Sequence, residues 1–330
     1  MKNFLKIALK FIFAGGIIYW LVSTGKLDFS LAIKVLETKS ALLFCLLLIV
    51  GQGILASIRW KILLRCGTNN PLPLKRLIGV TWIGLFFSSF LPGAVTGDLI
   101  KLVYVRDLDK EISKTFLVMT VLLDRILGLV ALFLLLGLFS IIYYSELSSF
   151  SKQLATLIHI NFLIFIGVIF FLVTLFLNTT WQEKILLLIV RVPILGKRIA
   201  KTFEQFWIIG ESKSGVFKCL LISVISHCMI IIAFYIISSP FYDSPISLGH
   251  TFTFMPLGLL AISIPIAPAG MGVGHAVFDT LFGYYNVSGG ASLFNLYFLA
   301  YVFINMLGIF PYIFMGKNTS VRLNIMKPQL

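Results

Sequence analysis

The sequence predicts an all-α polytopic membrane protein with about six full transmembrane helices and two re-entrant hairpins of broken helix. The first observation is composition: 59% of the residues are hydrophobic, 12% are charged, and the mean hydropathy is +1.01. A soluble domain carries much more charge. The second observation is a series of apolar runs long enough to form transmembrane helices. The third is that two shorter apolar runs are each followed by a segment rich in proline and glycine, which interrupts the helix. Residues 1–330 therefore form a single integral membrane domain.

The net charge of +14 would indicate a nucleic-acid partner in a soluble chain, but here Lys and Arg cluster between apolar segments. At such positions they meet anionic lipid headgroups, so the expected partner is the membrane and no nucleic acid is expected. The four cysteines lie in or beside apolar segments without CxxC spacing, which is typical of core residues. No metal or cofactor is predicted.

The chain contains six apolar runs close to the ~20 residues that a full span needs. They cover residues 4–22, 41–58, 115–141, 158–177, 217–238 and 292–315. Two further runs, 77–91 and 251–264, are too short to cross comfortably. Three lysines, Lys2, Lys6 and Lys10, lie at the N-terminal end of the first run as in a signal peptide, but no small-x-small cleavage site ends it. We expect an uncleaved first helix.

The first break follows residue 91, where Pro92, Gly93 and Gly97 oppose regular helix. Non-helical backbone at membrane depth is tolerated only where it is buried in protein or lines a water-filled cavity, because its N–H and C=O groups need hydrogen-bond partners. Asp98 and Lys101 follow within one helical turn. They form either a charge pair at the interface or a functional pair that contacts the substrate.

The second break is also rich in residues that oppose helix, namely Pro265, Pro268, Gly270, Gly272 and Gly274. Bare amides after such a turn are suited to cradle phosphate, whereas a dinucleotide site would need a preceding soluble strand. His275 and Asp279 share a face of the next helix but are too few for a metal site. We therefore predict substrate contacts at Gly270, Gly272 and His275, with protonation of His275 as a hypothesis for coupling.

The distribution of Lys and Arg predicts how the two breaks are arranged. Of the 27 Lys and Arg residues, Arg125 lies within a predicted span, and the other 26 lie in the connections or near the ends of the spans. If both broken segments crossed the membrane once, 12 of the 26 would lie inside and 14 outside, against the positive-inside rule. If residues 77–100 enter and return from the cytoplasm and 251–285 from outside, 22 lie inside and 4 outside. We therefore expect two opposed re-entrant hairpins, an inverted repeat, and both termini in the cytoplasm.

Asp124 and Arg125 lie in the apolar run 115–141. Each charge is costly in the membrane, so both must face protein or water. Neighbouring residues on a helix point about 100° apart, so each is expected to have a partner elsewhere in the chain. One interpretation is a structural ion pair that orients two helices. The other is that Arg125 holds an anionic headgroup by bidentate contact with phosphate while Asp124 positions it.

The connection 178–218 is the longest, and it mixes apolar and basic residues. This pattern predicts a segment that lies along the cytoplasmic interface and binds anionic lipid nonspecifically.

Three motifs resemble the lysylphosphatidylglycerol synthase transmembrane region, also called the flippase-like domain family. They are Phe90-Leu91-Pro92-Gly93 with Gly97-Asp98, then Leu123-Asp124-Arg125-Ile126-Leu127-Gly128, and Pro268-Ala269-Gly270-Met271-Gly272-Val273-Gly274-His275-Ala276. The third departs from the family pattern, since Ala269 replaces a glycine and Gly274-His275 replaces a polar pair. The resemblance covers nearly the whole chain and implies an inner-membrane protein that moves or presents phospholipids or polyprenyl-phosphate-linked sugars. No soluble transferase domain is expected, because 15 residues follow the last run.

These observations favour a lipid translocator of the bacterial inner membrane, with an anionic phospholipid or lipid-linked sugar as its substrate. A transporter is favoured over an enzyme. Two alternatives stay open: an integral transferase acting on a lipid headgroup, and an accessory subunit that partners an enzyme of envelope glycolipid synthesis. A transferase would need a complete acid–base constellation, which the sequence does not show.

Overall fold

The computed structural model describes residues 16, 19, 23, 30–65, 72–91, 96–150, 152–175, 179–190, 196, 200, 213–263 and 270–316. All regular structure in these ranges is helical, and no strand occurs there. The prediction of an all-α polytopic membrane protein is confirmed.

Four helical stretches in the described ranges are long and apolar enough to cross a membrane. They are α3 (Lys39–Arg65), α6 (Lys114–Ile142), α11 (Lys213–Ser238) continued by η1 (Ser239–Phe241), and α14 (Gly290–Met306) continued by α15 (Ile309–Gly316). They coincide with four of the six predicted spans. The first predicted span, 4–22, lies outside the described residues. The fourth, 158–177, falls on α8 (Lys152–Leu175), whose apolar stretch Ile158–Phe170 is shorter than the others.

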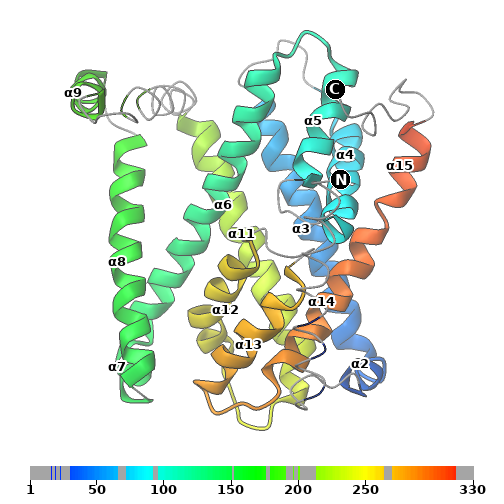
Figure 1. Ribbon diagram of the computed structural model, residues 1–330, viewed down its shortest axis with the longest axis vertical. Coiled ribbons are helices and arrows are strands. Elements are labelled where there is room, and N and C mark those ends of the chain that lie inside the picture. The colour runs from blue at the N-terminus through cyan, green and yellow to red at the C-terminus, as the bar shows by residue number, and fades with distance from the viewer. Residues whose placement is uncertain are drawn as a thin grey trace.

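The two broken segments each form a pair of short helices. The first pair is α4 (Leu74–Phe90) and α5 (Thr96–Leu108), and the second is α12 (Leu248–Ser263) and α13 (Val273–Gly283). Figure 1 shows α4 and α5 together in the upper half of the molecule and α12 and α13 together in the lower half. The predicted hairpin-breaking residues Pro92, Gly93, Pro265 and Pro268 lie outside the described residues, whereas Gly97 lies in the first turn of α5.

Each helix pair packs against its own apolar cluster. Around α4 and α5, buried side chains such as Trp60, Leu77 and Ile83 join these helices to α3 and α6. Around α12 and α13, buried aromatic rings predominate, including Phe254 and Phe278. The long helix α3 packs along α11 and connects the two halves.

The remaining helices are α2 (Ser30–Lys34), α7 (Tyr144–Phe150) and α9 (Thr179–Val190). Figure 1 shows α9 end-on, at a right angle to the neighbouring α8. Lys184 lies over the ring of Trp181 at 4.8 Å, and Leu187 and Leu188 are exposed. This orientation and composition suit a helix along a membrane surface. The rest of the predicted interfacial segment 178–218 lies mainly outside the described residues.

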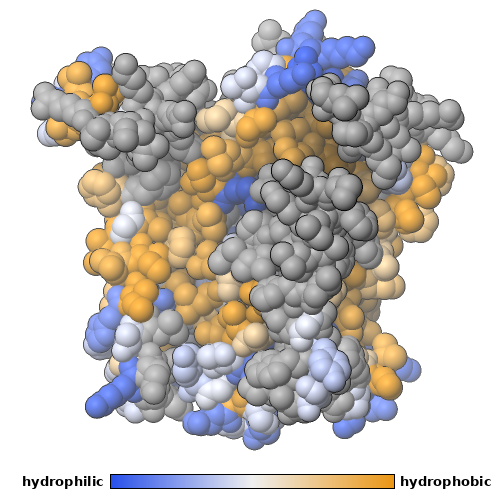
Figure 2. Space-filling model, viewed as in Figure 1, coloured by the Kyte–Doolittle hydropathy of each residue, from blue (hydrophilic) through white to orange (hydrophobic). Residues whose placement is uncertain are grey.

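The surface divides by height in the same view. Figure 2 shows apolar side chains over the middle of the molecule and hydrophilic side chains gathered towards its two ends. A small hydrophilic area interrupts the apolar band in a recess beside α6, the helix that carries Asp124 and Arg125. The candidate site is built around these two residues.

Candidate functional site

The site begins where α5 crosses closely over α4. Gly97 is buried, and a Cβ atom at this position would overlap the carbonyl oxygen of Gly84 and Oγ of Ser88. Glycine therefore permits a backbone approach that any side chain would prevent. The approach holds the first turn of α5, and with it Asp98, against the interior. An acidic residue is also favoured in this turn, because the helix dipole is positive there.

Asp98 binds two cations. Its Oδ1 accepts Lys101 Nζ at 2.6 Å, and its Oδ2 lies 2.7 Å from Arg125 Nε and 2.5 Å from Arg125 Nη2. The predicted neighbours Asp98 and Lys101 are therefore in contact, and α6 supplies a third member from 27 positions along the chain. Charge-assisted bonds of this length are strong, so the trio ties α5 firmly to α6.

Asp124 has a different partner, Arg59 of α3. The two side chains form a bidentate pair, Nε to Oδ1 at 2.6 Å and Nη2 to Oδ2 at 2.7 Å. Arg59 also donates from Nη1 to Ser223 Oγ on α11 at 2.7 Å. One guanidinium thus connects three long helices. As adjacent positions on a helix require, Asp124 and Arg125 do not pair with one another.

Arg59 was not among the residues predicted from the sequence. It lies directly after the apolar run 41–58, where a basic residue is ordinarily interpreted as the end of a span. In the structure α3 continues to Arg65, so that Arg59 lies within the helix. The usable signal was the regular apolar pattern that continues beyond Arg59 in Trp60, Ile62 and Leu63.

Trp60 of α3 contacts both Lys101, the partner of Asp98, and α6, the helix that carries Asp124. Lys101 Nζ lies 5.0 Å from the centre of its ring, and its Nε1 donates to Thr120 Oγ1 at 3.3 Å. A cation over an aromatic face is attracted by the ring quadrupole, which helps to compensate Lys101 for its lost hydration. The indole therefore links the ion pair of Asp98 and Lys101 to α6.

We call Arg59, Asp98, Lys101, Asp124 and Arg125 the charge cluster. It contains three cations and two carboxylates, so its formal charge is +1. Its side chains are 12–15% exposed, except that of Arg125, which is 36% exposed. Of these five side chains, that of Arg125 is the most accessible to a ligand.

The second break is organised differently. Gly270 and Gly272 both have positive φ, +74° and +78°, and Gly272 precedes the first turn of α13. The Gly272 N–H donates to His275 Nδ1 at 3.3 Å, and His275 Nε2 lies 3.2 Å from Asn295 Oδ1. These contacts require a neutral ring that accepts at Nδ1 and donates at Nε2.

His275 is only 1% exposed, and its ring meets the edges or faces of Phe294 and Phe298. This geometry makes it a cap that fixes the start of α13 against α14. The substrate contacts expected for Gly270, Gly272 and His275 stay a prediction. Within the described residues, no group of three or more His, Cys, Asp or Glu side chains is arranged to hold a metal.

The model of the lysylphosphatidylglycerol synthase TM region matches residues 7–308. The chain belongs to this family. The match includes the charge cluster and both broken helix pairs, and the family places the chain among multi-pass membrane domains related to lipid handling. A search of the curated proteins finds no significant match. The function of this member of the family has therefore to be argued from its own residues.

Proposed function

We propose that this protein binds a phospholipid or a polyprenyl-phosphate-linked sugar by its phosphate at the charge cluster, and moves it between the leaflets of the bacterial inner membrane. The observation that carries the proposal is the formal charge of +1 in a cluster whose most exposed member is Arg125. A net charge is costly at membrane depth. A singly charged phosphodiester would neutralise it.

The geometry supports an exchange of partners at Arg125. In the structure the guanidinium contacts Oδ2 of Asp98, and an arriving phosphodiester would offer two non-bridging oxygens to the same planar guanidinium. Asp98 would keep Lys101 when Arg125 turns to the phosphate, so no charge would be left alone. The Arg59–Asp124 pair would hold α3, α6 and α11 in place during the exchange.

The membrane topology is part of the proposal. We assign the end that bears the α5–α6 connection to the cytoplasm, so that α4 and α5 enter from that side and α12 and α13 from the other. Transport then follows from the two opposed hairpins, as in inverted-repeat carriers. No nucleotide-binding motif occurs in the sequence, so the movement would be passive, ion-coupled or driven by a partner.

The topology is tested by single cysteines placed at Lys110, between α5 and α6, and at Ser288, between α13 and α14. A membrane-impermeant reagent should label the first only from the cytoplasm and the second only from outside. Labelling of position 110 from outside would overturn the assignment.

The function is tested with purified protein in liposomes that contain fluorescent phosphatidylglycerol, by measuring the fraction of label that moves between leaflets. Arg125→Ala should reduce the rate by roughly a hundredfold, the value of a lost bidentate charged contact of about 3 kcal/mol. Arg125→Lys should retain more, because it keeps the charge but loses the planar fork. Lys114→Ala, an exposed cation on the same helix, is the matched control.

Equal rates in wild type and Arg125→Ala would remove the charge cluster from the mechanism. Absence of movement in the wild type, for several lipids, would instead favour a headgroup transferase or an accessory subunit of envelope glycolipid synthesis.

A further inference from the structure

A groove lies between α4, α5 and α15. Its volume is about 590 Å³, and its walls are formed by the first turns of α4, the last turns of α5 and the C-terminal half of α15. Lys101 of the charge cluster and Tyr104 of the groove are the nearest members on α5, three residues or about 4.5 Å apart along the helix axis. The two sites share no residue.

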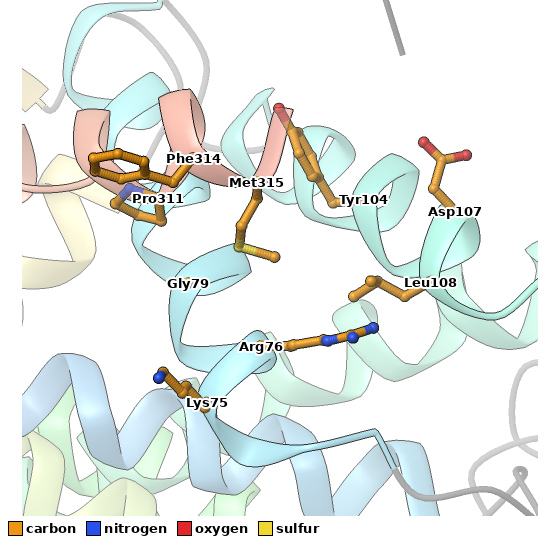
Figure 3. A pocket seen from close by; sticks show the side chains of 9 residues that line it. All are labelled: Lys75, Arg76, Gly79, Tyr104, Asp107, Leu108, Pro311, Phe314 and Met315. Atoms are coloured by element: carbon orange, nitrogen blue, oxygen red, sulfur yellow. The ribbon is translucent and has the colours of Figure 1, made fainter. Parts of the chain in front are cut away.

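One part of the groove is cationic. Lys75 and Arg76 are exposed, and Figure 3 shows the Arg76 side chain extending from α4 towards α5, where Leu108 lies. Within the described ranges, neither cation is within ion-pair distance of a carboxylate. Asp107 is the one acidic residue among the described residues of the lining, whose charged side chains sum to +1. Cations in the first turn of a helix oppose its dipole, so helix stability does not explain them.

The other part of the groove is apolar and faces the surroundings of the protein. Pro311, Phe314 and Met315 of α15 form this wall. Phe314 is 69% exposed, and the neighbouring Phe310 and Ile313 are also exposed. Such a face is stable only in contact with lipid, since it would be an unfavourable apolar patch in water. The groove therefore connects a polar end of the molecule with the apolar band.

A phospholipid has the same two parts in the same order. Its phosphate carries one negative charge at the membrane surface, and its acyl chains begin directly below. A free phosphate ion would satisfy the cations but not the apolar wall. In a zwitterionic phospholipid, the ammonium of the headgroup would be repelled by the cations that attract its phosphate. Both halves of the groove are complementary to a lipid whose headgroup has a net negative charge.

We propose that this groove is a binding site for an anionic phospholipid, with the phosphate held by Arg76, Lys75 adding positive charge from the other side of α4, and one acyl chain lying against Phe314 and Met315. The site does not depend on translocation at the charge cluster. It would hold lipid in a protein that transports, modifies or only presents lipids.

The test uses the full-length protein in nanodiscs made from equal amounts of phosphatidylglycerol and phosphatidylethanolamine. After transfer to a mild detergent, native mass spectrometry counts the lipids that stay bound. The wild type should retain phosphatidylglycerol in preference to phosphatidylethanolamine. The double variant Lys75→Gln, Arg76→Gln should lower that retention by about tenfold, as expected for the loss of charged hydrogen bonds.

Lys110→Gln is the matched control, because Lys110 is an exposed cation at the same end of the molecule but does not line the groove. It should leave retention unchanged. Phe314→Ala should weaken retention of both lipids, and added inorganic phosphate should not displace phosphatidylglycerol. Size-exclusion profiles and thermal midpoints show that each variant is folded.

Equal retention by the double variant and the wild type would overturn the proposal, as would displacement by inorganic phosphate or equal binding of the two lipids. The outcome is separable from the proposed function. If the double variant Lys75→Gln, Arg76→Gln loses bound lipid while the rate of lipid movement is unchanged, the groove binds lipid but takes no part in transport. In Arg125→Ala, loss of movement with lipid retained would support both sites.

Discussion

The second helix of the first pair, α5, carries Asp98 in its first turn, where it contacts Lys101 and Arg125. The second helix of the second pair, α13, carries His275 in its first turn, a neutral ring enclosed by Phe294 and Phe298. Both starts follow a break rich in proline and glycine. The difference lies in what the neighbouring helices offer. One charged partner from α6, Arg125, lies at the first start, and an amide and aromatic rings from α14 lie around the other.

This contrast shows that two similar breaks in one chain need not do similar work. The α4–α5 pair brings charges into the middle of the molecule, where a phosphate would find them. The α12–α13 pair is closed by packing and neutral hydrogen bonds, which suits a rigid support. The predictions below test whether the first pair is functional and the second structural.

The largest effect is expected from breaking the Arg59–Asp124 pair. Asp124→Ala leaves the Arg59 guanidinium with little exposure and no carboxylate, so it should lower the free energy of unfolding by about 3–5 kcal/mol. Thermal unfolding in detergent measures this loss. Ser223→Ala, which removes one hydrogen bond of Arg59, should cost only about 1 kcal/mol.

The double variant Arg59→Met, Asp124→Leu leaves no unpaired charge and should recover most of that stability. If Asp124→Ala proves as stable as the wild type, the pair does not hold α3 to α6.

The next largest effect should come from His275, the neutral residue in the first turn of α13. His275→Ala removes two hydrogen bonds and leaves a cavity between aromatic rings, so we expect a loss of about 2–3 kcal/mol. The exposed His159 supplies the control, and His159→Ala should have little effect. Lipid movement by any folded His275 variant should keep the pH dependence of the wild type. A shifted pH profile would revive proton coupling through this residue.

A pair of glycine substitutions compares the packing of the two helix pairs. Gly97→Ala should destabilise the protein by about 1–3 kcal/mol, because the added Cβ overlaps Gly84 and Ser88. Gly283→Ala, at the end of α13, meets nothing within 4 Å and should be neutral or stabilising by up to about 1 kcal/mol. The thermal unfolding midpoints of the two variants test this prediction. Similar midpoints would mean that α4 and α5 do not pack closely at Gly97.

The smallest effect should appear at the end of the molecule near α12 and α13. Asp243 accepts hydrogen bonds from the hydroxyl and the N–H of Ser288, and the hydroxyl contact in particular lowers the pKa of the carboxyl. A lowered pKa stabilises the folded protein above the ordinary value of about 3.9, and this contribution is lost as the pH falls towards the lowered pKa.

Since Asp243 is highly exposed, its contribution should be about 0.5 kcal/mol or less. Asp243→Asn should therefore lower the unfolding midpoint slightly at pH 7 and by less at pH 3. Glu111→Gln, an exposed change in another loop, should show no such pH dependence.

The sequence alone determined which segments become long apolar helices. The spans around α6, α11 and α14 match the predicted runs within a few residues, because local hydrophobicity decides where a helix can contact lipid. The span around α3 begins as predicted but continues to Arg65, beyond the predicted end at residue 58. The interruptions near residues 91 and 264 were likewise predicted from proline and glycine, which oppose helix wherever they occur. Membership of the family followed from motifs that are contiguous in the chain.

Only the tertiary structure decided how the charges pair. Asp124 could be seen to need a partner, but Arg59 is 65 positions away on another helix, and Arg125 meets Asp98 across 27 positions. Such pairings depend on the rotation and crossing of whole helices, which no local pattern encodes. The same holds for His275, whose enclosure by Asn295 and Phe294 required α14 to lie against α13. Charge in the sequence therefore indicated where a site was possible, and the packing of helices decided which residues form it.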